Sequence, residues 1–551
     1  MPVLLRLGLL LASLSAIAPP DARAERETVC TITINSPDEK EALERNLPPE
    51  RYRFVELVER GRPDWFAAAC RRDVRCDVLV ISGHFDDGTE FYSERLGARE
   101  SLPVDAMERA SCSNACASVF SQLKEVYLFG CNTLETAPLN VVSAEINRSL
   151  VRSGHSPEDA DRIARELGEL HGESNADRMR HVFKDVPAIY GFSAKAPLGA
   201  AAGPALEHYF RSGADGNFGT GRPSAKLVAA LAPASMTLAS GVTASDADAG
   251  VRRDLCQLDD DHLTAAQKLV FIHALLDREP AEVRMLLGRI EKYIASLSDA
   301  DRASPEAAAA LAGIVGDDGA RRRYLDFARD ADEPATRARM IELASALGWL
   351  SAAGKRAELA QMFAAQLAAP SVGVADIDLA CSLNRQHALD LAFDGPGVLP
   401  PEDTSLGQAA LRACLGDAAA RTRLLRGLAS ANAGDVEIAQ AYLRHRPLAD
   451  AAELRAVAAA VLRMPASAAQ VRALETLAGY RLSDHDTLQS LTRLFALAKS
   501  IDMQRAIAGV LIRADYATIA SPALVHALRT TRLKSPDGAD VIDILIRRLA
   551  S

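Results

Sequence analysis

Two runs of apolar residues carry the strongest secondary-structure signal in the chain. The first, 78–81, leads through a serine and a glycine to His84, and the second, 126–129, leads through a glycine to Cys131. Continuous apolar runs of this length, rich in Val, Ile and aromatic residues, are typical of central strands in a parallel sheet that is covered on both faces. We therefore expect two buried parallel strands, each ending close to a reactive side chain.

Weaker patterns predict further strands and helices around these two runs. β-Branched content predicts a strand over 29–35, alternation predicts one over 51–58, and another apolar stretch covers 188–193. Helical patterns begin at Ser36 and cover 65–72, 103–123, 144–183 and 206–210. Alternating strands and helices specify a doubly wound α/β sheet, which we place over 25–223.

The later part of the chain has a different pattern. From 256 to 551 strand signals vanish, and amphipathic segments such as 338–348 recur with breaks at Pro, Gly or Asp. Their loose period resembles that of HEAT or tetratricopeptide units, which predicts an irregular α-solenoid with an extended surface for a protein partner. A compact helical bundle is the alternative. Between the two regions, 224–255 is rich in Ala, Ser, Gly and Thr, which is typical of a linker.

His84 and Cys131 are the candidate catalytic residues. In parallel sheets the carboxyl ends of the strands form the reactive edge. Two parallel strands would therefore bring these side chains to one edge, where an imidazole can take the thiol proton and leave a thiolate nucleophile. The alternative is that the cysteine is a small buried apolar residue and that the histidine is structural.

The two strand ends resemble the signature of the caspase-like cysteine peptidases, in which an apolar block ends at the catalytic His and a later one at the catalytic Cys. Ser82-Gly83-His84 and Phe129-Gly130-Cys131-Asn132-Thr133 occupy these positions, and the resemblance covers about the first two hundred residues. It implies a caspase-like fold and an oxyanion hole built from the backbone N–H groups of Phe85 and Cys131. These families often have Gly after the His, and here Phe85 stands there.

Three further residues are candidates for substrate binding. Ser193 follows the strand after the Cys strand, where caspase-like enzymes often contact substrate backbone. Asp86 and Asp87 follow the His strand, and carboxylates in a specificity pocket would favour Lys or Arg before the cleaved bond. The alternative for this acidic run is a solvated face.

The first 24 residues predict export. One Arg, a short apolar core and Ala22-Arg23-Ala24 have the order of a secretory signal peptide cleaved after Ala24. The apolar core is short for a membrane span and Pro19-Pro20 interrupts it, so we expect a periplasmic or secreted protein with no membrane span after signal removal. The net charge of −10 and the absence of a basic block argue against nucleic acid as a partner.

The cysteine count supports the same compartment. Nine cysteines in an exported chain leave one unpaired if the other eight form disulfides, and we expect the unpaired one to be Cys131. We expect at least one disulfide among Cys30, Cys70, Cys76, Cys112 and Cys116, whose pairing the sequence leaves open. No His lies at ligand spacing from the Cys112–Cys116 pair, so a zinc site is not expected.

These observations favour an exported cysteine endopeptidase that acts on a protein or peptide substrate through His84 and Cys131. The reaction needs no metal and no organic cofactor. The helical region would bind substrate or a protein partner. The alternative is a caspase-like scaffold that no longer cleaves and serves as a protein-interaction module, which Phe85 in the place of Gly would favour.

Overall fold

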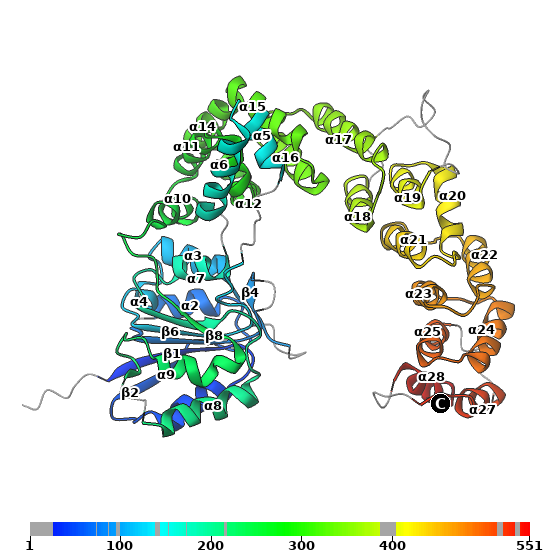
Figure 1. Ribbon diagram of the computed structural model, residues 1–551, viewed down its shortest axis with the longest axis horizontal. Coiled ribbons are helices and arrows are strands. Elements are labelled where there is room, and N and C mark those ends of the chain that lie inside the picture. Colours follow the sequence, from blue (N-terminus) through cyan, green and yellow to red (C-terminus); the bar gives the residue numbers. More distant parts are fainter. Residues whose placement is uncertain are drawn as a thin grey trace, which may run out of the picture. The chain divides into compact units, whose positions relative to one another are not determined.

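The computed structural model describes residues 26–72, 74–85, 88–94, 100–137, 144–152, 154–171, 174–213, 217–385, 389, 404–514, 522–534 and 540–550. The chain divides into two compact units, Met1–Gly313 and Ile314–Ser551. We describe each unit by itself and call them the first and the second unit (Figure 1).

A six-stranded sheet forms the centre of the first unit, with the strand order β2-β1-β3-β6-β7-β8. The strands are β1 (Glu27–Thr33), β2 (Tyr52–Glu56), β3 (Val78–Ser82), β6 (Glu125–Phe129), β7 (Ala188–Phe192) and β8 (Met236–Ala239). The first five run parallel to their neighbours, and β8 pairs antiparallel with β7. The expectation of a mostly parallel α/β sheet is confirmed.

Helices cover both faces of this sheet (Figure 1). One face packs against α1 (Asp38–Asn46), α8 (Gly199–Arg211) and α9 (Ala225–Leu231), and the other against α2 (Trp65–Arg71), α3 (Val104–Cys112), α4 (Ala117–Phe120) and α7 (Asn175–Val182). In β3, Val78 and Val80 face the first group while Leu79 and Ile81 face the second. Both faces of the strand are buried, which explains why its sequence is apolar without alternation.

The segment 224–255 is not the linker that its composition suggests. It contains α9, the edge strand β8 and the start of α10 (Ala249–Asp259). β8 is held by backbone pairing with β7, from Ile189 with Ala239 to Phe192 with Met236, so only a few of its side chains had to be apolar. Backbone pairing of this kind leaves a weak sequence signal.

The first unit also extends beyond the expected boundary, because further helices pack on it up to Gly313. These are α11 (Ala265–Leu276), α12 (Pro280–Ser296), α13 (Asp299–Ala303) and most of α14 (Pro305–Val315). Two more helices, α5 (Ala144–Arg152) and α6 (Pro157–His171), lie within the expected range. α10 packs on α3, and α12 packs on α5 and α6. The predicted helix over 103–123 is divided into α3 and α4, with Asn114 between them in the left-handed conformation at φ 55°.

The second unit consists of helices, with no strand among its described residues. They are α15 (Asp318–Asp330), α16 (Pro334–Ala346), α17 (Ala352–Leu367), α18 (Val374–Leu383), α19 (Leu406–Cys414), α20 (Ala418–Gly427), α21 (Ala433–His445), α22 (Ala451–Leu462), α23 (Ala468–Leu477), α24 (His485–Leu497), α25 (Ile501–Leu511), α27 (Pro522–Thr530) and α28 (Val541–Ala550). Many begin at a side-chain cap, as Ser467 and Ser500 do for α23 and α25.

Helices of the second unit pack in a repeating order. α21 packs on α23, α23 on α25 and α25 on α28, while α22 packs on α24 and α24 on α27. One continuous core joins them, from Ala338 to Ile546. In the first unit and the second alike, no helix among the described residues is long and apolar enough to cross a membrane.

Candidate functional site

His84 follows strand β3 and has a mostly buried side chain, 16% exposed. Its backbone N–H donates to the Tyr92 carbonyl at 2.9 Å, and its own carbonyl accepts from the Tyr92 N–H at 3.0 Å. This bridge folds the chain back directly after the strand, and the two ring centroids lie 5.5 Å apart. The backbone of His84 is therefore held at the carboxyl edge of the sheet.

Asn35 contacts the His84 ring from the neighbouring strand. Its Nδ2 lies 2.9 Å from His84 Nε2, and its Oδ1 accepts a hydrogen bond from Ser93 Oγ at 3.2 Å. The exposed carboxylate of Glu94 also approaches His84 Nε2, at 3.5 Å. Asn35 therefore orients the imidazole, a role that the sequence analysis missed. The available signal was its position just beyond β1, which pairs with β3.

Cys131 follows strand β6 and has a half-buried side chain. All nine cysteines lie within the described residues, and Cys131 is the one with a free thiol. The other eight form four disulfides: Cys30–Cys76, Cys70–Cys116, Cys112–Cys256 and Cys381–Cys414. The predictions of a free Cys131 and of at least one disulfide near the sheet are confirmed.

The structure places the two strand ends side by side. β3 and β6 are parallel neighbours in a register that pairs Ser82 with Phe129, and the Gly83 N–H donates to the Phe129 carbonyl at 3.1 Å. Just beyond the strands, a Cβ added at Gly130 would lie 2.9 Å from the Gly83 carbonyl oxygen. Glycine is thus required for the close approach of the two turns. His84 and Cys131 are the next residues on these turns.

The turn after Cys131 is fixed by several hydrogen bonds. Asn132 has a left-handed backbone at φ 58°, and its N–H donates to the Ala194 carbonyl at 2.7 Å. Thr133 Oγ1 donates to the Gly130 carbonyl at 3.2 Å and accepts from the Phe192 N–H at 3.0 Å. These contacts anchor the turn to the end of β7, so the position of the thiol is determined by the sheet.

Asn175 joins this turn to the loop that follows His84. Its Nδ2 donates to the Asn132 carbonyl at 3.0 Å. Its Oδ1 lies so close to Gly88 that a Cβ added there would be 2.5 Å away, and Gly88 has a left-handed φ of 73°. Asn175 begins α7, behind the capping box of Ser174 and Asp177. The sequence analysis did not single out this connection between the two loops.

Phe85 is fully buried behind the candidate dyad. Its ring packs on Phe91 with centroids 4.6 Å apart, and a Cβ added at Gly130 would lie 2.8 Å from Phe85 Cβ. Among the described non-glycine residues, positive φ occurs at Asn114, Asn132, Asp185 and Ser235. Phe85 therefore has an ordinary backbone conformation, so this position does not need a glycine.

Three further residues were predicted to bind substrate, and the structure describes one of them. Ser193 follows β7, at the same carboxyl edge of the sheet as Cys131. Its hydroxyl donates to the Ser235 carbonyl at 3.3 Å, and its N–H donates to the same oxygen at 3.1 Å. Its hydroxyl is therefore engaged in joining β7 to the residue before β8. Asp86 and Asp87 lie outside the described residues.

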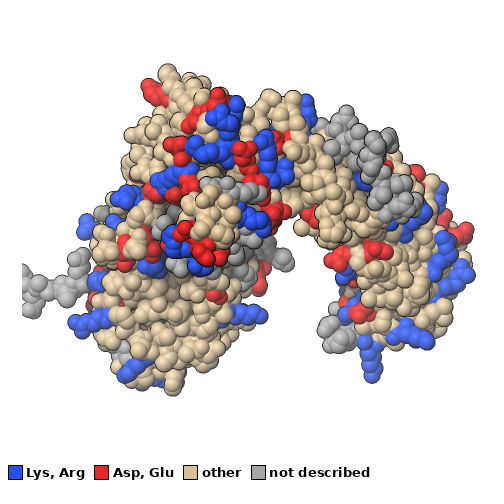
Figure 2. Space-filling model, turned by 45° about the horizontal axis from the view of Figure 1, so that its top comes forward, with Lys and Arg blue, Asp and Glu red and all other residues tan. Residues whose placement is uncertain are grey.

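A network of buried charges supports the loop after His84. Arg178 on α7 donates to the Gly88 carbonyl at 2.7 Å and approaches Glu108 on α3 at 3.4 Å. Glu108 also pairs with Arg289 of α12 at 3.2 Å, and Arg289 pairs with Asp259 at 3.2 Å. Burial raises the pKa of Asp259 to about 6, against the opposing attraction of Arg289. On the face of the molecule shown in Figure 2, Lys and Arg also lie interspersed with Asp and Glu.

Comparisons with profiles of known protein families, with curated proteins and with solved structures found no match to this chain.

Proposed function

We propose that the first unit is an exported caspase-like cysteine endopeptidase with a catalytic dyad of His84 and Cys131. The observation that carries this proposal is the position of Cys131. It is the free thiol of a chain whose other eight cysteines are paired, and it follows a strand that is the parallel neighbour of the strand before His84. A thiolate nucleophile requires a cysteine kept out of disulfides and a base nearby.

In the proposed mechanism, the Cys131 thiol gives its proton to His84. Because Nε2 is engaged by Asn35, Nδ1 is the ring nitrogen left for this transfer. The thiolate attacks the scissile carbonyl carbon, and the backbone N–H groups of Cys131 and Phe85 bind the oxyanion. His84 then donates its proton to the leaving amine as the C–N bond breaks. Water hydrolyses the thioester and restores the thiol, with His84 as the base.

Asn35 would act as a positioning residue in this mechanism. An imidazole that accepts the thiol proton at Nδ1 carries its other proton on Nε2, so Nε2 needs an acceptor, and the Asn35 amide offers its oxygen if it is turned over. Ser93 tolerates both orientations of the amide, since a hydroxyl can donate to Oδ1 or accept from Nδ2. In the turned orientation Asn35 accepts from Nε2 both before and after the proton moves from sulfur to ring.

Export and a binding role for the second unit complete the proposal. Four disulfides support an oxidising compartment, and residues 1–24 have the order of a signal peptide, which favours the periplasm or the exterior. The repeating contacts of α21, α23, α25 and α28 support a solenoid arrangement. Such an arrangement would present a long surface to a protein partner or substrate.

A thiol-directed peptidyl probe tests the dyad. We expect the full chain to be labelled at Cys131 under native conditions and labelling to be lost in Cys131→Ala. His84→Ala should slow labelling by about a hundredfold or more, as expected for loss of a general base. His208→Ala is the matched control, because His208 is exposed on α8, away from the strand ends.

The outcomes separate the two candidate functions. Labelling that depends on His84, together with peptide cleavage that Cys131→Ala abolishes, supports the peptidase. Labelling at a rate that His84→Ala leaves unchanged would contradict the dyad. A native chain that neither reacts with the probe nor cleaves any member of a peptide library would instead support the non-cleaving interaction module.

A further inference from the structure

A pocket of about 330 Å³ lies among three helices of the second unit. It is lined by α16, α17 and α18 together with the segments that join them. Its apolar part includes Met362 and Val372, and its polar part includes Arg337, Gln366 and two carboxylates, Asp332 and Asp376. This volume is in the range of small-molecule sites.

Arg337 brings to this pocket a buried N–H donor that has no hydrogen-bond partner. The residue is only 9% exposed, and its Nε is buried without a hydrogen-bond partner. The neighbouring carboxylate of Glu358 is bound by Arg329, whose Nε lies 3.2 Å from both of its oxygens. Burial lowers the pKa of Arg337, and the attraction of Glu358 opposes this only in part. A buried N–H group without an acceptor is costly, so a bound acceptor, best a carboxylate oxygen, would stabilise it.

Gln366 brings an unused acceptor to the same pocket. It is 8% exposed, and its Nε2 donates to Asp376 Oδ1 at 3.0 Å. A carboxylate can only accept, which fixes the orientation of the amide. Gln366 Oε1 is therefore defined as the oxygen, and it is buried without a donor. The pocket thus leaves one donor, Arg337 Nε, and one acceptor, Gln366 Oε1, without hydrogen-bond partners.

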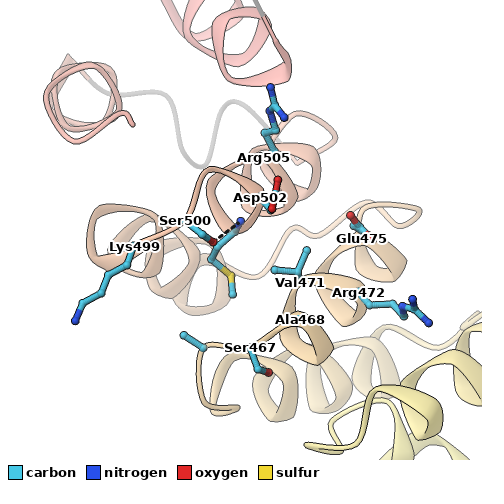
Figure 3. Close-up of a pocket in the computed structure, with 11 residues that line it drawn as sticks. Ser467, Ala468, Val471, Arg472, Glu475, Lys499, Ser500, Asp502 and Arg505 are labelled. Atoms are coloured by element: carbon cyan, nitrogen blue, oxygen red, sulfur yellow. Dashed lines mark hydrogen bonds between the residues drawn. The ribbon is translucent and has the colours of Figure 1, made fainter. Parts of the chain in front are cut away.

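A second pocket shows that arginines in this unit can have carboxylate partners. It lies between the beginnings of α23 and α25, has a volume of about 870 Å³, and is lined by Arg472 and Arg505 (Figure 3). Arg472 pairs with Glu437 at 2.8 Å, and Arg505 pairs with Asp540 at 3.2 Å. The arginines there have their carboxylates, and they serve as controls for Arg337.

We propose that the pocket around Arg337 binds a ligand that carries a carboxylate and an N–H group on the same carbon, as in an α-amino acid unit. The carboxylate pairs with the Arg337 guanidinium, and the N–H donates to Gln366 Oε1. A small apolar side chain on the ligand would lie against Met362 and Val372. A free amino acid and the last residue of a peptide share this chemistry. This site is independent of the proposed peptidase activity.

Calorimetric titration of the full chain with four compounds tests the proposal. Leucine represents the free amino acid and N-acetyl-leucine represents a peptide C-terminus, and we expect at least one of them to bind. Leucinamide lacks the carboxylate and should bind about tenfold to a hundredfold more weakly than leucine. 4-Methylpentanoate lacks the N–H and should bind about twofold to tenfold more weakly than the better of the first two ligands.

Two variants link binding to the pocket. Arg337→Gln should weaken binding by about tenfold to a hundredfold, while Arg472→Gln, which removes a paired arginine at the second pocket, should leave it unchanged. Without ligand, Arg337→Gln should unfold at the same temperature as the native chain or higher, because it removes a buried N–H group that has no hydrogen-bond partner. A loss of binding in a variant that keeps its thermal midpoint cannot be attributed to unfolding.

Other results would overturn the proposal. These are equal binding of leucine and leucinamide, unchanged binding in Arg337→Gln, or no measurable binding of both leucine and N-acetyl-leucine. Inorganic phosphate that binds more tightly than both would show a plain anion site and would also contradict it. Binding of leucine alone would identify a free amino acid as the source, and binding of N-acetyl-leucine a peptide C-terminus.

Discussion

At the scale of single residues, the most informative contact is that between Asn35 and His84. The 2.9 Å separation of Asn35 Nδ2 and His84 Nε2 holds the ring from the neighbouring strand, and Ser93 supports the amide from its other side. An amide has no charge of its own, so it can serve the ring in either protonation state. This explains how the ring can be oriented without being locked as an imidazolium.

Loss of this contact should affect the reaction more than the fold. We expect Asn35→Ala to lower the rate of Cys131 labelling by about tenfold to a hundredfold, less than the loss of the base itself. Asn35→Asp should restore part of the rate and shift the alkaline limb of the pH profile to higher pH, because a carboxylate favours the imidazolium. Pseudo-first-order labelling from pH 5 to 9 measures both. A rate in Asn35→Ala equal to that of the native chain would contradict the positioning role.

Asp259 offers a test of the buried charge network by pH. Its pKa is raised to about 6, mainly by burial, so the folded state holds this proton more tightly than the unfolded chain does. The resulting stabilisation is complete below about pH 4 and is lost as the pH rises through about 6. Asp259→Asn should therefore be more stable than the native chain at pH 7.5, by up to about 3 kcal/mol, and the difference should shrink towards pH 4.

Urea unfolding at several pH values measures this difference. Arg289 keeps Glu108 as a partner at 3.2 Å in the Asp259→Asn variant, so the rest of the network is not left unpaired. Asp261→Asn is the matched control, since Asp261 is exposed two residues further along the chain. A stability difference that does not vary with pH would contradict the assigned burial effect.

At the scale of elements, helix α3 joins the sheet to the helices added after it. It packs on α7 and α10, and Cys112 at its end is bonded to Cys256 on α10. The same helix carries Glu108, which pairs with Arg178 and Arg289. α3 therefore connects the loop after His84 with α10 and α12.

Removal of the Cys112–Cys256 bond should destabilise the first unit. The bond closes a sequence separation of 144 residues, and its loss in the double variant Cys112→Ala, Cys256→Ala should lower the free energy of unfolding by about 2 to 4 kcal/mol. Trp65 fluorescence in a Trp349→Phe background reports this unit, because the chain has two tryptophans and Trp65 is buried in it.

The matched control is the double variant Cys381→Ala, Cys414→Ala. This bond joins α18 to α19 in the second unit. Its loss should leave the Trp65 transition in place and, in a Trp65→Phe background, should shift that of Trp349. Equal effects of the two double variants on Trp65 would show that the disulfides do not act within their own units.

At the scale of the whole molecule, the boundary between the units lies after Gly313 rather than before 256. The difference matters because β8 and α10 belong to the first unit. β8 covers one edge of the sheet through its pairing with β7, and an uncovered edge is prone to association with other chains.

Truncated chains test this boundary. We expect residues 26–313 to fold alone, with a cooperative Trp65 transition and a single monomer peak in size-exclusion chromatography. Residues 26–223 should aggregate or remain unfolded, because they lack β8 and leave Cys112 without Cys256. Circular dichroism and light scattering on both fragments distinguish these outcomes. A stable monomer of 26–223 with a native Trp65 transition would place the boundary where composition alone suggested it.

Local pattern was sufficient for the central strands and for the helical character of the second unit. A strand buried on both faces must be apolar throughout, and β3 and β6 are, so their positions and the residues after them could be predicted. The free state of Cys131 also followed from an odd cysteine count in a chain expected to form disulfides. These features depend on the environment of each residue by itself, and that environment favours particular residue types in the sequence.

Tertiary structure decided which residues contact one another, because the type of a residue does not indicate which distant residue it will contact. The pairing of Cys112 with Cys256, the Asn35 amide on His84 and the backbone pairing of β8 each join distant segments. The unpartnered Nε of Arg337 became visible only in the fold, where the neighbouring Glu358 is bound to Arg329. By itself the sequence determined which segments are buried and where the free thiol stands. The fold determined what surrounds that thiol, since contacts between remote residues depend on geometry that no local pattern encodes.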